Sequence, residues 1–400
     1  MSEPKAFAGM RVVDLTQGIA GPHCTMLLAQ HGADVIKIEP MEGDWGRTLG
    51  ELRGDHGGHS VAFNRGKRSI ALNLKHPEGI AIVRKLTAQA HVFGESFRPG
   101  VVGRLGLGYE AVKAMNGKIV YFSVSGFGQE GPFSRRPTVD ALIQAFSGMM
   151  VMNRTADGVP HRQGMIAVDV LTGLYGFQAV SAALMRQVRF GVGTFIDNSM
   201  MQATAAFQGA KLMEHAISNG NPPPLYVPTG MFRTSNGYIV VSSMRQHHFN
   251  KLMELVGRPE LLDDPRLQTH ETRLRSAPIV NKVLAEAFPA KTTEEWLELL
   301  IGAGVFAERV NNYQDYLDHP HVQAVRSVDW LEQDGVGRMP IARIPGLPRP
   351  SEDPAAQHAP HIGEQGREIL AEMGYGNGDI ERLIADGAVG AGSGAAQAAE

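Results

Sequence analysis

The chain has 400 residues, which is more than one hydrophobic core usually organises, so two domains are expected. Hydrophobic residues make up 43% and charged residues 20%, which is typical of a soluble globular protein and excludes a disordered chain or a coiled coil. The net charge of -3 gives no broad attraction to nucleic acid or to an acidic membrane, and a small phosphorylated ligand fits better than a polymer.

A single cysteine, Cys24, excludes an internal disulfide and suits a reducing compartment. The sequence has no run of about 18 apolar residues that would span a membrane. Its start lacks the basic and apolar regions of a signal peptide. We therefore expect a cytoplasmic protein with neither a nucleic acid nor a membrane as its partner.

Short apolar runs alternate with helical segments in the first half of the chain. Residues 10–16 and 32–39 have the pattern of strands, and a helix ending near Gln30 lies between them. This succession is a βαβ unit and predicts an α/β fold with a parallel sheet. Further elements are expected at 77–90 (helix), 91–96 (strand), 109–115 (helix), 118–124 (strand), 193–199 (strand) and from there to about 217 (helix).

A polar loop with three consecutive prolines, at 219–224, ends this half. We expect a large domain over 1–218 and a smaller α+β domain, in which Thr292 and Glu295 have the spacing of a capping box. The remaining segments are expected to be a linker (219–235), the small domain itself (236–330), a return linker with C-terminal helices that pack on the large domain (331–386) and a mobile tail (387–400).

One carboxylate, Asp169, precedes a long run of small and apolar residues. The segment 170–184 has no charge and no proline, which predicts a buried helix with Asp169 as its N-cap. Such a residue accepts hydrogen bonds from free backbone N–H groups at the positive end of the helix dipole. These residues alone favour a purely structural cap over a functional carboxylate.

Other signatures of known chemistry are weak or missing. Gly126, Gly128 and Gly131 match a dinucleotide-binding pattern, but Pro132 and Pro137 argue against the helix that must follow it. Phosphate-binding P-loops, zinc-protease motifs and serine-hydrolase elbows do not occur in the sequence. The histidine pairs, at 247–248 and at 319 and 321, have no third ligand at matching spacing, so no metal site is expected.

Several blocks in a fixed order carry a resemblance to a known family. They are 13–16 (VDLT) with 20–22 (AGP), 32–39 (GADVIKIE), 64–75 (NRGKRSIALNLK), 97–100 (FRPG), 125–132 (SGFGQEGP), 136–137 (RP) with Asp140 and Gln144, 169–173 (DVLTG) and 318–322 (DHPHV). With these blocks the chain resembles the class III CoA-transferases, which include formyl-CoA transferase and carnitine CoA-transferase. The blocks cover nearly the whole chain.

The resemblance implies a fold that composition does not reveal. It implies a Rossmann-like large domain formed by both chain ends, a smaller α+β domain between them, and an interlocked homodimer. It also implies that Asp169 is a nucleophile that forms a mixed anhydride and then an aspartyl-CoA thioester. The expected partners are an acyl-CoA and a carboxylic acid acceptor, with coenzyme A thioester as substrate, no permanently bound cofactor and no metal. The helix end is expected to keep Asp169 ionised and to offer N–H groups to an oxyanion.

Contacts to coenzyme A follow from the same resemblance. Coenzyme A needs cations to bind its phosphates, an apolar surface to bind adenine and a channel to hold the pantetheine arm. The residues implied are Ile19, Ala20, Leu72, Asn73, Leu74, Lys75, Ser96, Phe97, Arg98, Arg104, Asp140 and Met200. By themselves Lys75 and Arg104 would be solvated surface charges and Met200 a core residue.

Departures from the family pattern bear on the substrate. Formyl-CoA transferase has a glutamine in place of Ile19, an arginine in place of Pro40 and a glycine-rich loop that 228–256 lacks, so oxalate is not expected. A small dicarboxylate such as succinate is preferred as donor by analogy. The related α-methylacyl-CoA racemases carry a histidine where this chain has Val139, which weakens but leaves open an isomerase. A CoA-binding member without catalysis is the remaining alternative, and the presence of Asp169 disfavours it.

Overall fold

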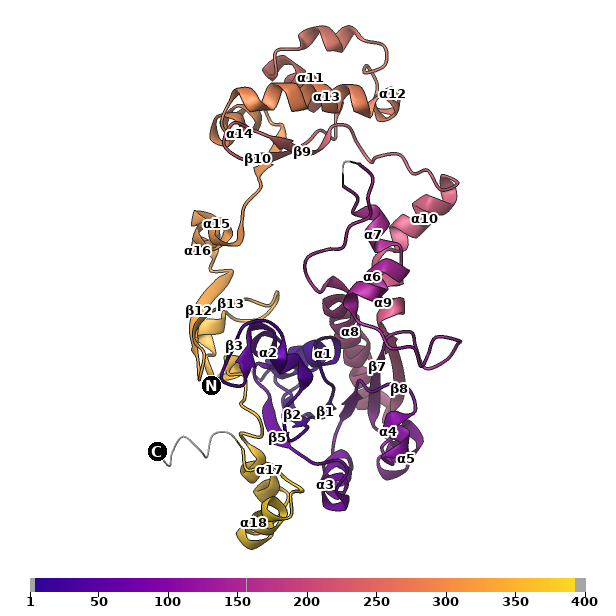
Figure 1. Ribbon diagram of the computed structural model, residues 1–400, viewed down its shortest axis with the longest axis vertical. Coiled ribbons are helices and arrows are strands. Elements are labelled where there is room, and N and C mark those ends of the chain that lie inside the picture. The colour runs from indigo at the N-terminus through magenta and orange to yellow at the C-terminus, as the bar shows by residue number, and fades with distance from the viewer. Residues whose placement is uncertain (1–3, 156, 393–400) are drawn as a thin grey trace. The chain divides into compact units, whose positions relative to one another are not determined.

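The computed structural model describes residues 4–155 and 157–392. The chain divides into two compact units, one formed by 1–209 with 326–400 and the other by 210–325. Figure 1 shows their elements, with the chain coloured from indigo at the N-terminus to yellow at the C-terminus.

The first unit is built on a six-stranded parallel sheet. Its strands are β1 (Arg11–Leu15), β2 (Asp34–Glu39), β5 (Arg68–Ala71), β6 (Val92–Glu95), β7 (Val120–Ser125) and β8 (Thr194–Ser199). They lie in the order β5-β2-β1-β6-β7-β8, which is the 3-2-1-4-5-6 order of a Rossmann fold. The register places Val13 of β1 beside Ile36 of β2 and Phe93 of β6. The predicted parallel α/β sheet is confirmed.

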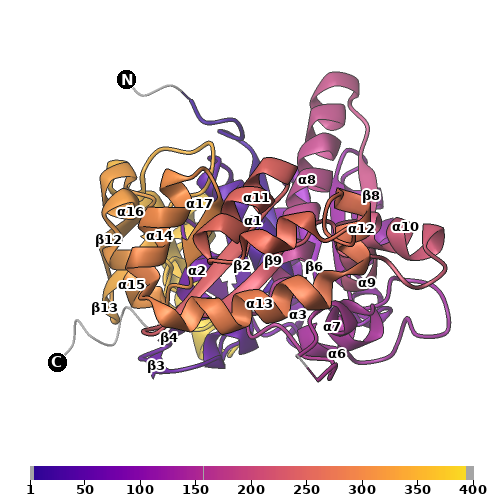
Figure 2. The ribbon, with the colours of Figure 1, turned by 90° about the horizontal axis from the view of Figure 1, so that it is seen from above.

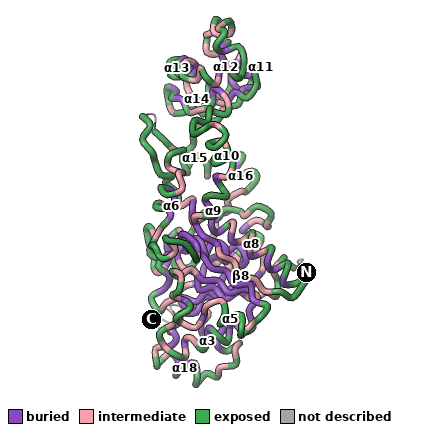
Figure 3. Tube along the Cα trace, turned by 90° about the vertical axis from the view of Figure 1, so that its right-hand side faces the viewer, coloured by how far each residue is buried: buried purple, intermediate pink, exposed green. Residues whose placement is uncertain are grey.

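Both faces of this sheet are buried, as the apolar runs of its strands require. Val12 faces one core with Val35 and Phe122, whereas the next residue, Val13, faces a second core with Ile36. Figure 3 shows the buried residues concentrated on these strands. Alternate residues of each strand therefore support two separate layers of helices.

Helices from both ends of the chain form these layers. On the Val12 face lie α1 (Ala20–Gln30) and α8 (Ala167–Phe190), which run alongside each other (Figure 2). On the Val13 face lie α3 (Pro77–Thr87), α5 (Tyr109–Met115), α17 (Gly366–Glu372) and α18 (Asn377–Ala385). Helices from residues 20–190 and from residues 366–385 thus pack on one sheet.

Helix α8 is long and apolar enough to cross a membrane by length and composition alone. Its small residues instead allow close packing inside the unit. A Cβ on Gly173 would lie 2.6 Å from Nδ1 of His23, and a Cβ on Gly176 would lie 2.7 Å from Cζ of Phe122. We therefore describe α8 as a core helix of this fold.

The first unit has further short elements. They are η1 (Trp45–Thr48), β3 (Leu52–Arg53), β4 (His56–Gly57), α2 (Gly58–Asn64), α4 (Val101–Arg104), α6 (Asp140–Phe146), α7 (Met149–Met152), α9 (Met200–Phe207), β12 (Val328–Gln333), β13 (Gly337–Ala342), η4 (Pro350–Glu352) and η5 (Ala355–Gln357). The hairpin of β12 and β13 falls partly in the segment expected as a return linker. Gly337 and Pro340 are unfavourable in most strands, so β13 was not predicted. Because β13 has only one neighbouring strand, the missing N–H of Pro340 is tolerated.

The second unit is smaller and contains an antiparallel sheet in the order β11-β10-β9. Its elements are α10 (Gly209–Ile217), β9 (Thr229–Arg233), β10 (Tyr238–Ser242), α11 (Gln246–Leu255), η2 (Pro259–Asp263), α12 (His270–Arg275), α13 (Ala277–Ala287), η3 (Phe288–Ala290), α14 (Thr293–Gly302), β11 (Phe306–Arg309), α15 (Tyr313–Asp318) and α16 (Pro320–Val325). The predicted capping box of Thr292 and Glu295 opens α14. Strand β9 lies in the segment expected as a linker, because its pairing with β10 outweighs the neighbouring prolines.

Part of the segment expected to be mobile is instead built into the core. Ala388 and Val389 are buried, and the N–H of Gly390 donates to the carbonyl of Ala71 at 2.9 Å. The expectation of mobility is therefore wrong for these residues, whose small side chains fit beside β5. The rest of that segment, 393–400, lies outside the described residues.

Candidate active site

A cavity of about 270 Å³ opens at the carboxyl ends of β1, β6 and β7. Strands β1 and β6 are neighbours in the sheet, and the strand order reverses between them. Ligands of open α/β sheets bind at this switch point, because the loops that follow the two strands diverge there. The described residues that line the cavity are Gln17, Ile19, Ala20, Gly21, Trp45, Ser96, Phe97, Arg98, Pro99, Val124, Ser125, Gly126, Ser134, Arg136, Pro137, Thr138, Val139, Asp169 and Met200.

The fold brings seven of the expected site residues into this lining. They are Ile19, Ala20, Ser96, Phe97, Arg98, Asp169 and Met200. Asp140 does not line the cavity, but its carboxylate accepts the backbone N–H of Asp169. The site thus joins the loops after β1 and β6 to the N-terminus of α8 and the start of α9.

The other expected residues follow β5 or β6 outside the cavity. Leu72 as a whole residue is only 1% exposed and belongs to the core. Asn73 donates from its side chain to the carbonyl of Gly387 at 3.3 Å, and Leu74 packs against the core. Lys75 and Arg104 are exposed. Residues 72–75 nevertheless share the carboxyl edge of the sheet with the cavity, because β5 is parallel to β1.

Several residues of the lining were missed by the sequence analysis. Gln17 and Ser125 stand at the carboxyl ends of β1 and β7, a position that could have identified them. Arg136 lies inside a recognised block but was given no role. Trp45 carried no signal, because its place in the cavity depends on tertiary contact with Gly18.

The turn between β1 and α1 is shaped around Trp45. Gly18 has a φ of +79°, and a Cβ at this position would lie 2.1 Å from Cζ2 of Trp45. Only glycine combines this left-handed backbone with such close approach. Trp45 therefore packs directly on the turn that carries Ile19 and Ala20 into the cavity.

Buried ion pairs hold the same turn in place. Nζ of Lys37 donates to Oδ2 of Asp44 at 2.8 Å and to the carbonyl of Thr16 at 3.2 Å. Oδ1 of Asp44 in turn accepts the N–H of Gly18 at 2.8 Å. Burial by itself would lower the pKa of Lys37, but Asp44 and Asp14 raise it above its ordinary value. The ammonium therefore stays charged beneath the cavity.

The loop after β6 is held by Glu95. Its Oε2 accepts the N–H of Phe97 at 2.8 Å, and its other oxygen accepts the Ser123 hydroxyl. Burial raises the pKa of Glu95 to about 7, and Asp197 adds to the effect. Glu95 therefore holds the loop whose residues Ser96 and Arg98 line the cavity.

Asp140 caps α8 from a separate helix. Its Oδ2 accepts the N–H groups of Val168 at 2.7 Å and Asp169 at 3.1 Å, while Oδ1 accepts from Nε2 of Gln144 at 2.6 Å. The N-cap of α8 is Ile166, whose side chain makes no capping hydrogen bond, and Asp169 is the third residue of the helix. The expectation that Asp169 is the N-cap is wrong, because Asp140 takes that role across the fold.

Asp169 therefore does not cap α8, and it lines the cavity. Burial raises its pKa to about 7, and the charge of Asp140 adds to this rise. The helix end was expected to favour the ionised form of Asp169, but burial and the charge of Asp140 act in the opposite direction on its pKa. The N–H groups of Val168 and Asp169 at this helix end donate to Asp140. The result is a poorly solvated carboxylate that is in balance with its acid near neutral pH.

Comparison with known proteins identifies the family of this chain. A profile of CoA-transferase family III matches residues 7–366 of the chain. The chain belongs to CoA-transferase family III. The human succinyl-CoA:glutarate CoA-transferase is 33% identical over 398 residues, which cover 97% of this chain and 91% of that protein. The acetyl-CoA:oxalate CoA-transferase of Acetobacter aceti is 34% identical, covering 93% of this chain and 97% of that protein.

Solved structures of the family agree with the fold. A CAIB/BAIF family protein from Brucella suis superposes with a TM-score of 0.80 at 31% identity, covering 93% of this chain and 100% of that one. The resemblance stated from the sequence is confirmed, and this family III member is an enzyme of the CoA-transferase class. The glycines at 126 and 128 belong to a loop, and the next helix, α6, begins only at Asp140. A dinucleotide-binding helix is thus missing after them, as the prolines predict.

Proposed function

We propose that this enzyme transfers CoA from an acyl-CoA to a free carboxylic acid through covalent intermediates on Asp169. The observation that carries the proposal is the Asp169 carboxyl in the wall of the switch-point cavity, with a pKa raised to about 7. A weakly solvated carboxylate is a better nucleophile than one in water. At neutral pH a large part of it is ionised and ready to attack.

The covalent steps balance without an external acid or oxidant. An Asp169 oxygen attacks the thioester carbonyl and forms a C–O bond, the C–S bond breaks, and CoA leaves as thiolate, so that a mixed anhydride of the donor acid and Asp169 is formed. The thiolate then attacks the Asp169 carbonyl, the C–O bond between this carbonyl and the donor acyl group's oxygen breaks, and the donor acid leaves as carboxylate, so that an aspartyl-CoA thioester remains. The acceptor carboxylate then reverses the two steps, so that Asp169 is restored and a new acyl-CoA leaves.

Two cations favour a small dicarboxylate as substrate. Arg98 and Arg136 line the cavity, and neither has a carboxylate partner among the described residues. The Arg136 guanidinium lies 4.9 Å from the ring centre of Phe133, which limits its motion. A guanidinium can hold a distal carboxylate in a two-pronged contact. With relatives named for succinyl-CoA and glutarate, we propose succinyl-CoA as donor and a small dicarboxylate as acceptor.

Coenzyme A is proposed to lie along the carboxyl edge of the sheet. Neighbouring parallel strands are about 4.8 Å apart, so β5 is about 10 Å from β1 along this edge. The pantetheine arm can span that distance and place its phosphates near Lys75 and Arg104. Asn73 and Leu74 would then face the nucleotide with their backbone or exposed edges.

The alternative, an α-methylacyl-CoA racemase, needs a second acid or base beside the substrate. No histidine is among the described residues that line the cavity, and Val139 precedes Asp140. We therefore prefer the transferase. Incubation with succinyl-CoA and glutarate should yield glutaryl-CoA and succinate. In deuterated water, a racemase would instead incorporate deuterium at the α-carbon of 2-methylacyl-CoA without any acceptor acid, and this outcome would overturn the assignment.

A homodimer is proposed because apolar side chains remain exposed on the first unit. Met185, Val188 and Phe190 on α8 are 60%, 64% and 67% exposed, and Phe207 on α9 is 55% exposed. Exposed apolar surface of this kind typically marks an interface. Interlocking of the two copies stays a prediction of the family resemblance. Light scattering of the purified chain should give twice the 43.2 kDa mass of one copy, whereas a monomer at micromolar concentration would contradict it.

A further inference from the structure

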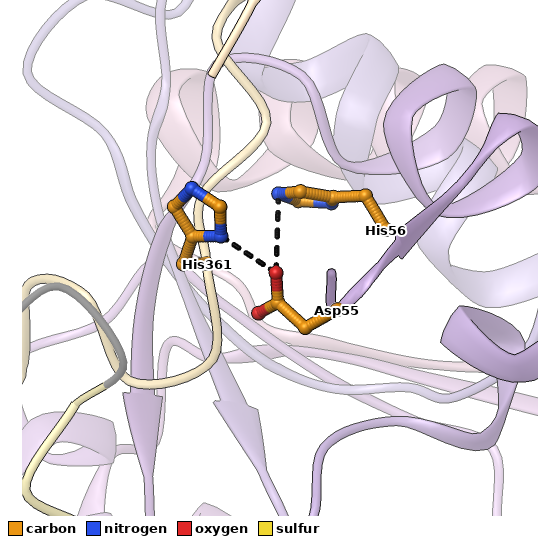
Figure 4. Close-up of side chains that lie close together, drawn as sticks. All are labelled: Asp55, His56 and His361. Atoms are coloured by element: carbon orange, nitrogen blue, oxygen red, sulfur yellow. Dashed lines mark hydrogen bonds and ion pairs between the residues drawn. The ribbon is translucent and has the colours of Figure 1, made fainter. Parts of the chain in front are cut away.

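A cluster of two histidines and one carboxylate lies apart from the Asp169 cavity (Figure 4). Asp55 and His56 stand at the β3–β4 turn, and His361 comes from the segment before α17. One ligand atom from each residue lies within 4.8 Å of the other two. Oδ1 of Asp55 is 2.6 Å from Nδ1 of His361 and 3.7 Å from Nε2 of His56. None of the three lines the Asp169 cavity.

The His56 ring is the observation that points to a ligand. The residue is only 1% exposed, and its Nε2 has no hydrogen-bond partner among the described residues. Buried polar atoms are nearly always paired, so an unpaired one needs an explanation. Figure 4 shows this nitrogen directed at Asp55 rather than away from the cluster. A cation between the two groups would satisfy it.

The surrounding groups are those that usually support metal-binding histidines. Oδ2 of Asp334 is 3.3 Å from Nε2 of His361, on the side of the ring opposite Asp55. The Ser60 hydroxyl is 3.5 Å from Nδ1 of His56. The Asp334 carboxylate can hold the proton on Nε2 of His361, and the Ser60 hydroxyl orients the His56 ring. Each imidazole can therefore direct its other nitrogen at the same point.

The local charge does not oppose a cation as strongly as the nearby arginine suggests. Nη1 of Arg47 lies 3.6 Å from Oδ2 of Asp55 and 3.5 Å from Nδ1 of His56, but Nε and Nη2 of the same guanidinium are bound by the two oxygens of Glu39 at 2.7 Å, which offsets its charge. Asp55 and Asp334 then contribute negative charge around the cluster.

We propose that Asp55, His56 and His361 bind one divalent transition-metal ion, with Zn²⁺ the best match to two imidazoles and one carboxylate. Zinc binds imidazole nitrogen and carboxylate oxygen at about 2.0–2.2 Å and accepts water as a fourth ligand. Binding opens the hydrogen bond between Asp55 and His361 and displaces the proton from Nδ1 of His361 into solvent. The ion ties the segment before α17 to the turn at β4, two pieces of the first unit that are 306 residues apart. Its role is structural, because the Asp169 chemistry proceeds without it.

The test uses the full chain without a histidine tag. Protein dialysed against a chelator is titrated with Zn²⁺ in competition with a coloured chelator, and Co²⁺ provides a visible spectrum of the site. We expect one ion per chain and a rise in Tm when the ion is bound. His361→Gln should weaken binding by at least about tenfold, and Asp334→Asn by about 10- to 100-fold as for other groups that orient a ligand.

The controls separate this site from other histidines. His59→Gln changes a neighbouring histidine on α2 that is outside the cluster, so Zn²⁺ affinity should stay as in the wild type. Asp334 is largely exposed, so Asp334→Asn should fold even if variants of the buried His56 do not. Wild-type protein that takes up no Zn²⁺ or Co²⁺ would overturn the proposal, and so would His361→Gln protein that binds as tightly as wild type.

Discussion

Asp169→Ala is expected to lower the rate of CoA transfer by at least about a thousandfold, because loss of a nucleophile removes the whole covalent route. The alanine leaves the helix cap intact, since Asp140 and not Asp169 accepts the first N–H groups of α8. The folded structure should therefore persist. Steady-state transfer from succinyl-CoA to glutarate measures the effect, and circular dichroism checks the fold.

The matched control replaces a carboxylate that lies outside the cavity. Asp157 lies ten residues before the start of α8 at Ala167 and is exposed, so Asp157→Ala should transfer CoA at the wild-type rate. Wild-type protein treated with acyl-CoA and hydroxylamine or borohydride should carry a modification at Asp169 that mass spectrometry locates. Full transfer by Asp169→Ala would disprove the nucleophile assignment.

The pH profile gives a second readout of the same carboxyl. Burial and the charge of Asp140 raise the pKa of Asp169 to about 7, and only the ionised form attacks. The rate should therefore rise with pH, fall about tenfold for each unit below 7, and level off above it. Asp140→Asn removes the neighbouring charge and should move this inflection to lower pH. A rate that is flat from about pH 5 to 8 would contradict the assignment.

The second large effect is expected at Lys37. Its side chain is fully buried against Asp44, and Lys37→Met leaves that carboxylate buried without its cation. Removal of one partner from a buried ion pair typically costs about 3–5 kcal/mol in the free energy of unfolding. Asp44 also accepts the N–H of Gly18, so the turn under Trp45 should loosen and KM for the acyl-CoA should rise. Urea unfolding and steady-state kinetics measure the two effects.

An exposed ion pair in the same unit is the control. Arg367 and Glu381 contact at 2.6 Å with side chains that are 51% and 62% exposed. Arg367→Met should cost less than about 1 kcal/mol, because water solvates both charges when they separate. Equal losses in the two variants would show that burial of Lys37 has no special role in holding the cavity.

Hydrophobic pattern alone predicted the strands that carry the site. The runs at 10–16, 32–39, 91–96 and 118–124 became β1, β2, β6 and β7, because both faces of a parallel sheet must be apolar. Strand β5 was not predicted. It begins with Arg68 and follows Lys67, and these cations are paired with Asp34 and Asp14, which are remote in sequence. A local hydrophobic pattern does not detect such a strand, because the residues that neutralise its charges are remote in sequence.

The sequence by itself determined the family, the α/β class and the identity of Asp169 as the candidate nucleophile, since these rest on local pattern and ordered motifs. Only the tertiary structure decided the state of that carboxyl. Asp140, 29 residues away, takes the helix N–H groups, and burial with its charge raises the pKa of Asp169 to about 7. Trp45 over Gly18 and the cluster of Asp55, His56 and His361 likewise depend on contacts between distant segments. Desolvation and charge act through space, so sequence spacing does not reveal them.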